Sequence, residues 1–162
     1  MSENNLMKKE VHILVAEYGS DQSALICNNL KRVGITNPII EFNDGHEVLD
    51  FLIKKKKTGG CDAKKACLLL VDLNLPRVGG LEVLRRIKTP GMPGNISVII
   101  IITSANQPEV EECRRLGFSN FITKPIIYED FVAAIKKLGF ILMIVEAPTV
   151  TSVSAVQEER NG

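Results

Sequence analysis

LLLVDLNLPRVGGLEVLRRIK, residues 68–88, is the stretch that decides the fold class. It opens with a short continuous apolar run. Periodicity alone would also allow a helix, but the short length and the polar flanks favour a strand covered on both faces in a parallel sheet. After a Pro-x-x-Gly-Gly turn, Leu81, Leu84 and Ile87 recur at helical spacing, with basic residues in the last turn as the helix dipole favours. The stretch therefore predicts a strand, a tight turn and a helix, with Asp72 closing the strand.

The same order of strand and helix recurs along the whole chain. The five apolar runs of strand length are Val11–Ala16, Pro38–Phe42, Cys67–Val71, Ser97–Ile102 and Asn120–Thr123. The five segments with helical spacing are Asp21–Arg32, Asp44–Lys57, Gly80–Lys88, Glu109–Leu116 and Tyr128–Leu138. Right-handed crossovers turn this (βα)₅ order into an α/β protein with a doubly wound, five-stranded parallel sheet.

Length and composition favour one globular domain. The chain has 162 residues, of which 45% are hydrophobic and 24% charged. We expect a domain over residues 10–145, a flexible N-terminus over residues 1–9 and a disordered C-terminal tail over residues 146–162. The tail is too short for a helix-turn-helix, so we expect no DNA-binding domain in it.

Charge and cysteine content exclude several further classes. Lys and Arg number 20 and Asp and Glu number 19, so the net charge of +1 provides no general attraction for nucleic acid or membranes. The four cysteines form no C-x-x-C pair, which argues against a zinc knuckle or a disulfide scaffold. Without a signal peptide or an 18-residue apolar segment, we expect a cytoplasmic protein with no membrane partner.

Charged side chains follow the predicted strands at positions that a parallel sheet brings to one edge. Glu17 follows the first strand, Asp72 closes the third and Lys124 follows the fifth. Taken singly, these residues fit a solvated loop acid, a helix cap and a surface lysine. Taken together, two carboxylates with the Asn74 carbonyl and water would provide the all-oxygen ligands that Mg²⁺ prefers. Lys124 would pair with a carboxylate and then with a phosphoryl oxygen, and the Lys124–Pro125 peptide is a candidate cis bond in a tight turn.

These elements resemble the receiver domain of two-component response regulators. Residues 68–88 and LGFSNFITKP, residues 116–125, are similar to that family's pattern in residue type and spacing. The resemblance extends over about residues 11–140, and it is greatest to single-domain receivers associated with phytochrome-type histidine kinases. It implies the flavodoxin-like receiver fold.

The resemblance also implies a chemistry. Asp72 would accept a phosphoryl group from a phosphohistidine on a sensor histidine kinase or phosphotransfer protein, with Mg²⁺ held by Glu17, Asp72 and Asn74. Such a protein is a stoichiometric acceptor with slow self-dephosphorylation rather than a turnover enzyme, and it signals to a protein target. The remaining implied residues are Lys124, Thr103 and Ser104 for phosphate binding, Phe121 as the switching aromatic and Pro125 for the turn.

Two departures from the family pattern bear on this site. The family usually has two adjacent acids after the first strand, and Ala16 takes the place of one of them, which should weaken Mg²⁺ binding. Counting back from Lys124 without a gap places Ile102 at the usual hydroxyl position, whereas a one-residue deletion restores Thr103.

Two other functions compete with this interpretation. One is a pseudo-receiver that binds partners without phosphorylation, which Ala16 favours. The other is a small phosphatase of the haloacid-dehalogenase type, but that chemistry needs a second Asp where this chain has Asn74.

The apolar run Gly139–Val145 favours an additional contact surface. Seven consecutive apolar positions would cover every face of a helix, so the domain core cannot bury them all. The run either folds back over the domain or forms a symmetric homodimer.

Overall fold

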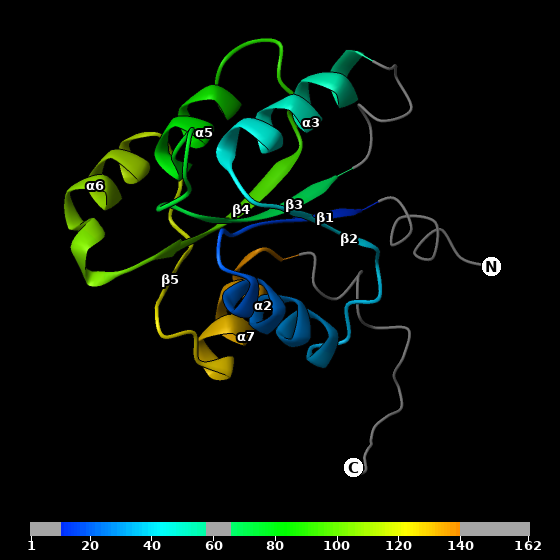
Figure 1. Ribbon diagram of the computed structural model, residues 1–162, viewed down its shortest axis with the longest axis vertical. Helices are drawn as coiled ribbons and strands as arrows, with labels where there is room; N and C mark the ends of the chain where they lie inside the picture. Colours follow the sequence, from blue (N-terminus) through cyan, green and yellow to red (C-terminus); the bar gives the residue numbers. More distant parts are fainter. Residues whose placement is uncertain (1–10, 58–65, 140–162) are drawn as a thin grey trace.

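A computed structural model describes residues 11–57 and 66–139, and it confirms the predicted alternation of strands and helices (Figure 1). The strands are β1 His12–Ala16, β2 Ile39–Phe42, β3 Cys67–Asp72, β4 Ile96–Ile102 and β5 Phe121–Thr123. The helices are α2 Ser20–Arg32, α3 Gly45–Lys57, α5 Gly80–Ile87, α6 Gln107–Arg115 and α7 Tyr128–Lys137, and a 3₁₀ turn at Ser104–Asn106 precedes α6.

The five strands form one parallel sheet in the order β2-β1-β3-β4-β5. Chain order reverses between β1 and β3, and ligands of such folds bind near this point. Ala16 pairs with Val71 and Asp72 pairs with Ile101, so the carboxyl ends of β1, β3 and β4 share one edge. The predicted doubly wound α/β fold is confirmed, and this edge is where the site has to lie.

Helices cover both faces of the sheet, which explains why the strands are apolar without alternation. Figure 1 shows α3, α5 and α6 over one face and α2 and α7 over the other. Leu69 and Val71 of β3 pack toward the first group, and Leu68 and Leu70 pack toward the second. All four of these side chains are fully buried.

Gly80 fixes the distance between α5 and the end of β3. A Cβ atom at position 80 would lie 2.5 Å from the main-chain oxygen of Asp72 and 2.6 Å from the Cα of Leu73. A glycine is therefore required for α5 to begin this close to the strand end. The same contact holds the loop after Asp72 against the domain.

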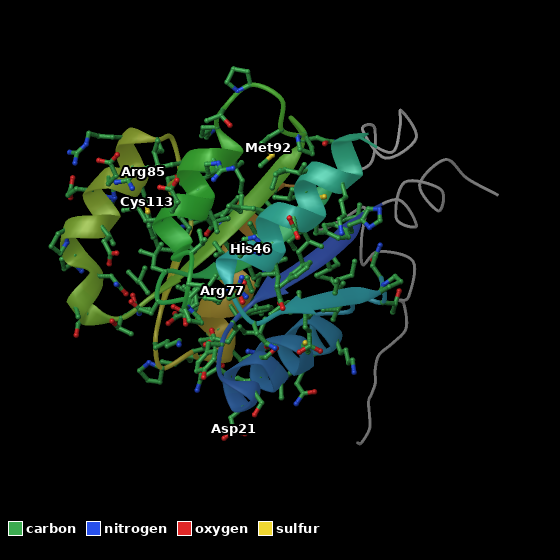
Figure 2. All side chains as sticks on the ribbon, turned by 45° about the horizontal axis from the view of Figure 1, so that its top comes forward. Asp21, His46, Arg77, Arg85, Met92 and Cys113 are labelled. Atoms are coloured by element: carbon green, nitrogen blue, oxygen red, sulfur yellow. The ribbon has the colours of Figure 1, made fainter. Side chains whose placement is uncertain are left out.

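Arg77 ties that loop to the start of α3. Its guanidinium donates to Asp44 Oδ2 at 3.1 Å, and Asp44 Oδ1 accepts from the main-chain nitrogen of Glu47 at 2.9 Å. Figure 2 shows Arg77 beside the start of α3. Asp44 therefore caps α3 and binds the β3–α5 loop with its two oxygens. Arg77 adopts φ +64°, the left-handed region that few non-glycine residues occupy.

The predicted boundaries differ from the structure mainly around α6. The helix begins at Gln107 instead of Glu109, after a 3₁₀ turn that the sequence did not indicate. Gly117 has φ +100° directly after the helix, the left-handed conformation in which many helices end on a glycine. Of the apolar run Gly139–Val145, residues 140–145 lie outside the described residues, as do residues 1–9 and 146–162.

Candidate functional site

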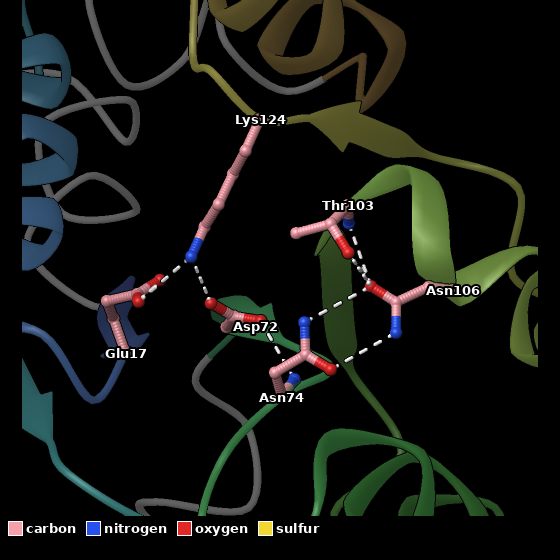
Figure 3. Close-up of polar contacts among 6 residues, drawn as sticks. All are labelled: Glu17, Asp72, Asn74, Thr103, Asn106 and Lys124. Atoms are coloured by element: carbon pink, nitrogen blue, oxygen red, sulfur yellow. Dashed lines mark hydrogen bonds and ion pairs between the residues drawn. The ribbon is translucent and has the colours of Figure 1, made fainter.

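Three strand ends bring Glu17, Asp72 and Lys124 into contact, as predicted (Figure 3). Lys124 Nζ lies 2.6 Å from Asp72 Oδ2 and 3.2 Å from Glu17 Oε2. Both carboxylates belong to residues that are only 3% exposed. We call Glu17 and Lys124 the charged side of Asp72.

Burial and the neighbouring charges change the pKa values of both Glu17 and Lys124. The pKa of Glu17 is raised to about 7, chiefly because burial desolvates the carboxylate, and the adjacent Asp72 carboxylate adds to this effect, whereas Lys124 opposes it. Burial alone would lower the pKa of Lys124, but the carboxylates of Asp72 and Glu17 outweigh it and raise that pKa overall. The lysine is therefore a fixed positive charge beside Asp72.

Neutral groups occupy the other side of Asp72. The main-chain nitrogen of Asn74 donates to Asp72 Oδ1 at 2.8 Å. The Asn74 carboxamide forms a reciprocal pair with Asn106, with N–O distances of 3.2 and 3.1 Å. Thr103 completes the group, because its Oγ1 donates to Asn106 Oδ1 at 3.2 Å. We call Asn74, Asn106 and Thr103 the amide side of Asp72 (Figure 3).

Asn106 is the site residue that sequence reasoning missed. Its side chain also accepts from the main-chain nitrogen of Thr103 at 2.8 Å, which forms a capping box over the 3₁₀ turn. The available signal was the spacing Thr-x-x-Asn directly after a strand, which is a helix-start pattern. That pattern predicts the cap but not the contact with Asn74.

The structure places the two candidate hydroxyl positions differently. Ile102 ends β4 with 5% exposure and packs in the core, whereas the side chain of Thr103 joins the amide side. Ser104 is exposed in the 3₁₀ turn. Thr103 is thus the residue whose hydroxyl is held next to Asn74.

The remaining predicted residues, Phe121 and Pro125, lie in β5 and just after it. Phe121 in β5 is half-buried against the core, and the Arg114 guanidinium carbon lies 5.3 Å from the centre of its ring. The Lys124–Pro125 peptide is cis, which confirms that prediction. The main-chain nitrogen of Lys124 donates to Ile102 oxygen at 2.8 Å, so β4 holds the start of this turn in place.

The donor set fits a magnesium ion with few protein ligands. Glu17 Oε1 is buried, and within residues 11–57 and 66–139 it has no hydrogen-bond partner. A buried, unpaired carboxylate oxygen is costly unless a cation or donor occupies its free side. The same residue ranges contain no cluster of three or more His, Cys, Asp or Glu side chains suited to a metal, so the two carboxylates would need oxygen ligands from the main chain and water.

Fold and site together define a class of protein, an α/β domain with a buried aspartate and a lysine at the carboxyl edge of a parallel sheet. The family model for the response regulator receiver domain matches residues 13–136. The chain belongs to the response regulator receiver family of two-component signalling.

Solved structures and curated relatives agree with this assignment. The bacteriophytochrome response regulator RtBRR is 31% identical, with a TM-score of 0.67, over 79% of this chain and 77% of that one. A receiver domain from Rhodospirillum rubrum is 34% identical, with a TM-score of 0.61, over 85% and 96% of the two chains. A chemotaxis protein CheY homolog of Campylobacter jejuni is 28% identical over 70% of this chain and 80% of the relative. The predicted resemblance to phytochrome-associated receivers is confirmed.

In the part of the chain that the structure describes, no helix is both long enough and apolar enough to span a bilayer.

Proposed function

We propose that the protein is a single-domain response regulator in which Asp72 accepts a phosphoryl group from a phosphohistidine. The observation that carries this proposal is the contact of Lys124 with two buried carboxylates, at 2.6 Å from Asp72 and 3.2 Å from Glu17. A structural ion pair needs one carboxylate for one lysine. A second buried carboxylate with an unpaired oxygen supports a site that receives further positive charge.

The proposed transfer is a displacement at phosphorus. A carboxylate oxygen of Asp72 forms a new O–P bond while the N–P bond of the phosphohistidine breaks, and the bonding electrons return to the imidazole nitrogen. The Asn74 main-chain nitrogen fixes Asp72 Oδ1, and Lys124 neutralises charge that builds up on the transferring oxygens.

Mg²⁺ is the proposed cofactor, held by Glu17, Asp72 and the main-chain carbonyl of Asn74. When bound, it would supply a second positive charge to the phosphoryl oxygens. Glu17 Oε1 supports this role because a metal would satisfy the buried oxygen that has no partner among the described residues. The protein would then act as a stoichiometric acceptor with slow self-dephosphorylation.

A pseudo-receiver is the second candidate, and a specific observation favours it. Ala16 is completely buried at the end of β1, so the position that usually carries a further acid contributes packing only. With two carboxylates instead of three, the site would bind Mg²⁺ more weakly. A phosphorylation-independent binding module would keep the fold and the ion pairs while taking up no phosphoryl group.

The partners and the domain limits remain part of the proposal. We infer a sensor histidine kinase or phosphotransfer protein as donor, a downstream protein as target, a cytoplasmic location and a domain over residues 10–145.

The homodimer through residues 139–145 stays a prediction. Ile141→Glu combined with Ile144→Glu should give a folded monomer in sedimentation equilibrium, and a monomeric wild type at high concentration would contradict the dimer.

Intact mass spectrometry tests the proposed function. With Mg²⁺ and acetyl phosphate, the wild type should gain one phosphoryl group, and Asp72→Asn should gain none. Omitting Mg²⁺ should abolish the gain in the wild type. An unchanged mass at saturating acetyl phosphate would overturn phosphorylation in favour of the pseudo-receiver.

A further inference from the structure

Asn106 has a completely occupied carboxamide in a buried position. The residue is 3% exposed. Its Oδ1 accepts from Thr103 N, Thr103 Oγ1 and Asn74 Nδ2, and its Nδ2 donates to Asn74 Oδ1 and to Glu109 Oε1. Both hydrogens of the amide are used, so no capacity for another acceptor remains.

The identity of this residue follows from those partners. Its Nδ2 faces two acceptor oxygens, Asn74 Oδ1 at 3.1 Å and Glu109 Oε1 at 2.5 Å. An aspartate at position 106 would present an oxygen to both of them and lose both bonds. Only an amide supplies a donor on this side and an acceptor toward Thr103.

The Thr103 hydroxyl has one hydrogen, and Asn106 holds it. Oγ1 donates to Asn106 Oδ1 at 3.2 Å. The resemblance to receiver domains implies that the same hydroxyl donates to a phosphoryl oxygen on Asp72. One hydrogen cannot serve both acceptors in full, so phosphorylation has to break the bond to Asn106.

We propose that Asn106 is a positioning residue that holds the Thr103 hydroxyl in the unphosphorylated protein, and that a phosphoryl group on Asp72 takes this hydroxyl from it. The inference rests on the proposed function. It adds that the phosphoryl oxygen competes with Asn106 Oδ1 for the hydroxyl hydrogen of Thr103. Asn106 also links Asn74 to the start of α6, since it precedes Gln107, the first residue of that helix. The Thr103 hydroxyl therefore changes its acceptor at the place where the β3–α5 loop and the start of α6 meet.

Removing the competitor should make the phosphorylated arrangement easier to reach. Of the bonds that Asn106→Ala removes, the one that competes with a phosphoryl oxygen joins Asn106 to the Thr103 hydroxyl. This bond is neutral and partly buried, a type whose net contribution corresponds to about a twofold to tenfold change in an equilibrium constant. Asn106→Ala should therefore bind the phosphoryl analogue beryllofluoride, in the presence of Mg²⁺, about twofold to tenfold more tightly than wild type. The gain should depend on the hydroxyl of Thr103.

A double-mutant cycle separates this role from a purely structural one. Beryllofluoride would be titrated with Mg²⁺ into wild type, Asn106→Ala, Thr103→Val and the double variant, with bound analogue measured by ¹⁹F NMR. We expect tighter binding for Asn106→Ala in the wild-type background and no gain in the Thr103→Val background. A change of equal size in both backgrounds, or weaker binding by Asn106→Ala, would overturn the inference.

Two further variants keep the test decisive if Asn106→Ala does not fold. Asn74 is exposed, so Asn74→Ala should fold, and by removing a partner of Asn106 it should give a smaller gain that also requires Thr103. Asn28→Ala, on the exposed face of α2, serves as the matched control and should leave affinity unchanged. No gain from Asn74→Ala would then overturn the inference.

The wild-type titration distinguishes failure of the proposed phosphoryl site from failure of the role proposed for Asn106. A wild type that binds no beryllofluoride with Mg²⁺ would overturn the proposed phosphoryl site, and this inference with it. A wild type that binds the analogue while the cycle shows no coupling would overturn the role of Asn106 and leave the phosphoryl site standing.

Discussion

The two sides of Asp72 are built from different chemistry. On the charged side, Lys124 lies between two buried carboxylates, with contacts of 2.6 and 3.2 Å. On the amide side, the neutral carboxamides of Asn74 and Asn106 pair with each other and hold Thr103. The charged side can stabilise negative charge that arrives at Asp72, whereas the side chains of the amide side are neutral and exchange hydrogen-bond partners. We therefore expect the first to determine whether transfer occurs and the second to determine how the loops respond.

The largest effect should come from the charged side. Lys124→Met removes the cation that contacts Asp72 Oδ2 at 2.6 Å, and loss of one electrostatic stabiliser of a transition state typically slows a reaction about 100-fold or more. The rate of phosphoryl uptake from acetyl phosphate, followed by intact mass, should fall by about this factor. Lys136→Met, at an exposed position in α7, is the matched control. A Lys124→Met variant that is phosphorylated at the wild-type rate would remove the distinction between the two sides.

A smaller effect should follow from disturbing the close contact between Gly80, at the start of α5, and the main chain of Asp72. Gly80→Ala would place a Cβ atom 2.5 Å from the main-chain oxygen of Asp72, so the start of α5 has to move away from the strand end. We expect a loss of about 1–3 kcal/mol in the free energy of unfolding, as for other overpacked sites. Urea unfolding measures it, and Gly94→Ala, where an added Cβ atom meets open space, is the control. Equal stability of the two variants would mean that the contact is not tight.

The smallest effect concerns the protonation of Glu17. Its pKa is raised to about 7 by burial and by Asp72, so the carboxyl is protonated below that pH and ionised above it. Only the ionised form binds Mg²⁺, so affinity should be lost as the pH falls, by about tenfold between roughly pH 8 and pH 6.

Titrating Mg²⁺ at several pH values, with Glu17→Gln as reference, checks this expectation. The variant has no carboxyl at position 17, so its weaker affinity should change much less with pH. The same pH dependence in wild type and Glu17→Gln would show that another group controls the metal.

The charged side could be predicted from the sequence, because parallel topology alone brings strand ends together. Once the runs around Glu17, Asp72 and Lys124 are identified as parallel strands, their ends have to meet at one edge. The apolar runs also predicted the sheet, since helices on both faces leave no strand face for water. No side-chain geometry was needed for either conclusion.

The amide side could not be predicted in the same way. Asn74 and Asn106 are 32 residues apart in the sequence, and their pairing depends on the 3₁₀ turn that orients Asn106. The sequence also left two positions open for the hydroxyl. Pairing of Ile102 with Thr123 settles the end of β4 and places Thr103 beyond it. Such contacts depend on register and side-chain orientation, which residue spacing does not fix to within one position.

Locating the phosphoryl group in the chain is the most direct test of the central claim. The wild type would be treated with Mg²⁺ and acetyl phosphate and then reduced with borohydride, which converts an aspartyl phosphate into homoserine. The account predicts homoserine at position 72, only when Mg²⁺ is present, and none in the Lys124→Met variant under the same brief exposure. A reduced product at Glu17 or at any other carboxyl, with aspartate unchanged at position 72, would contradict it.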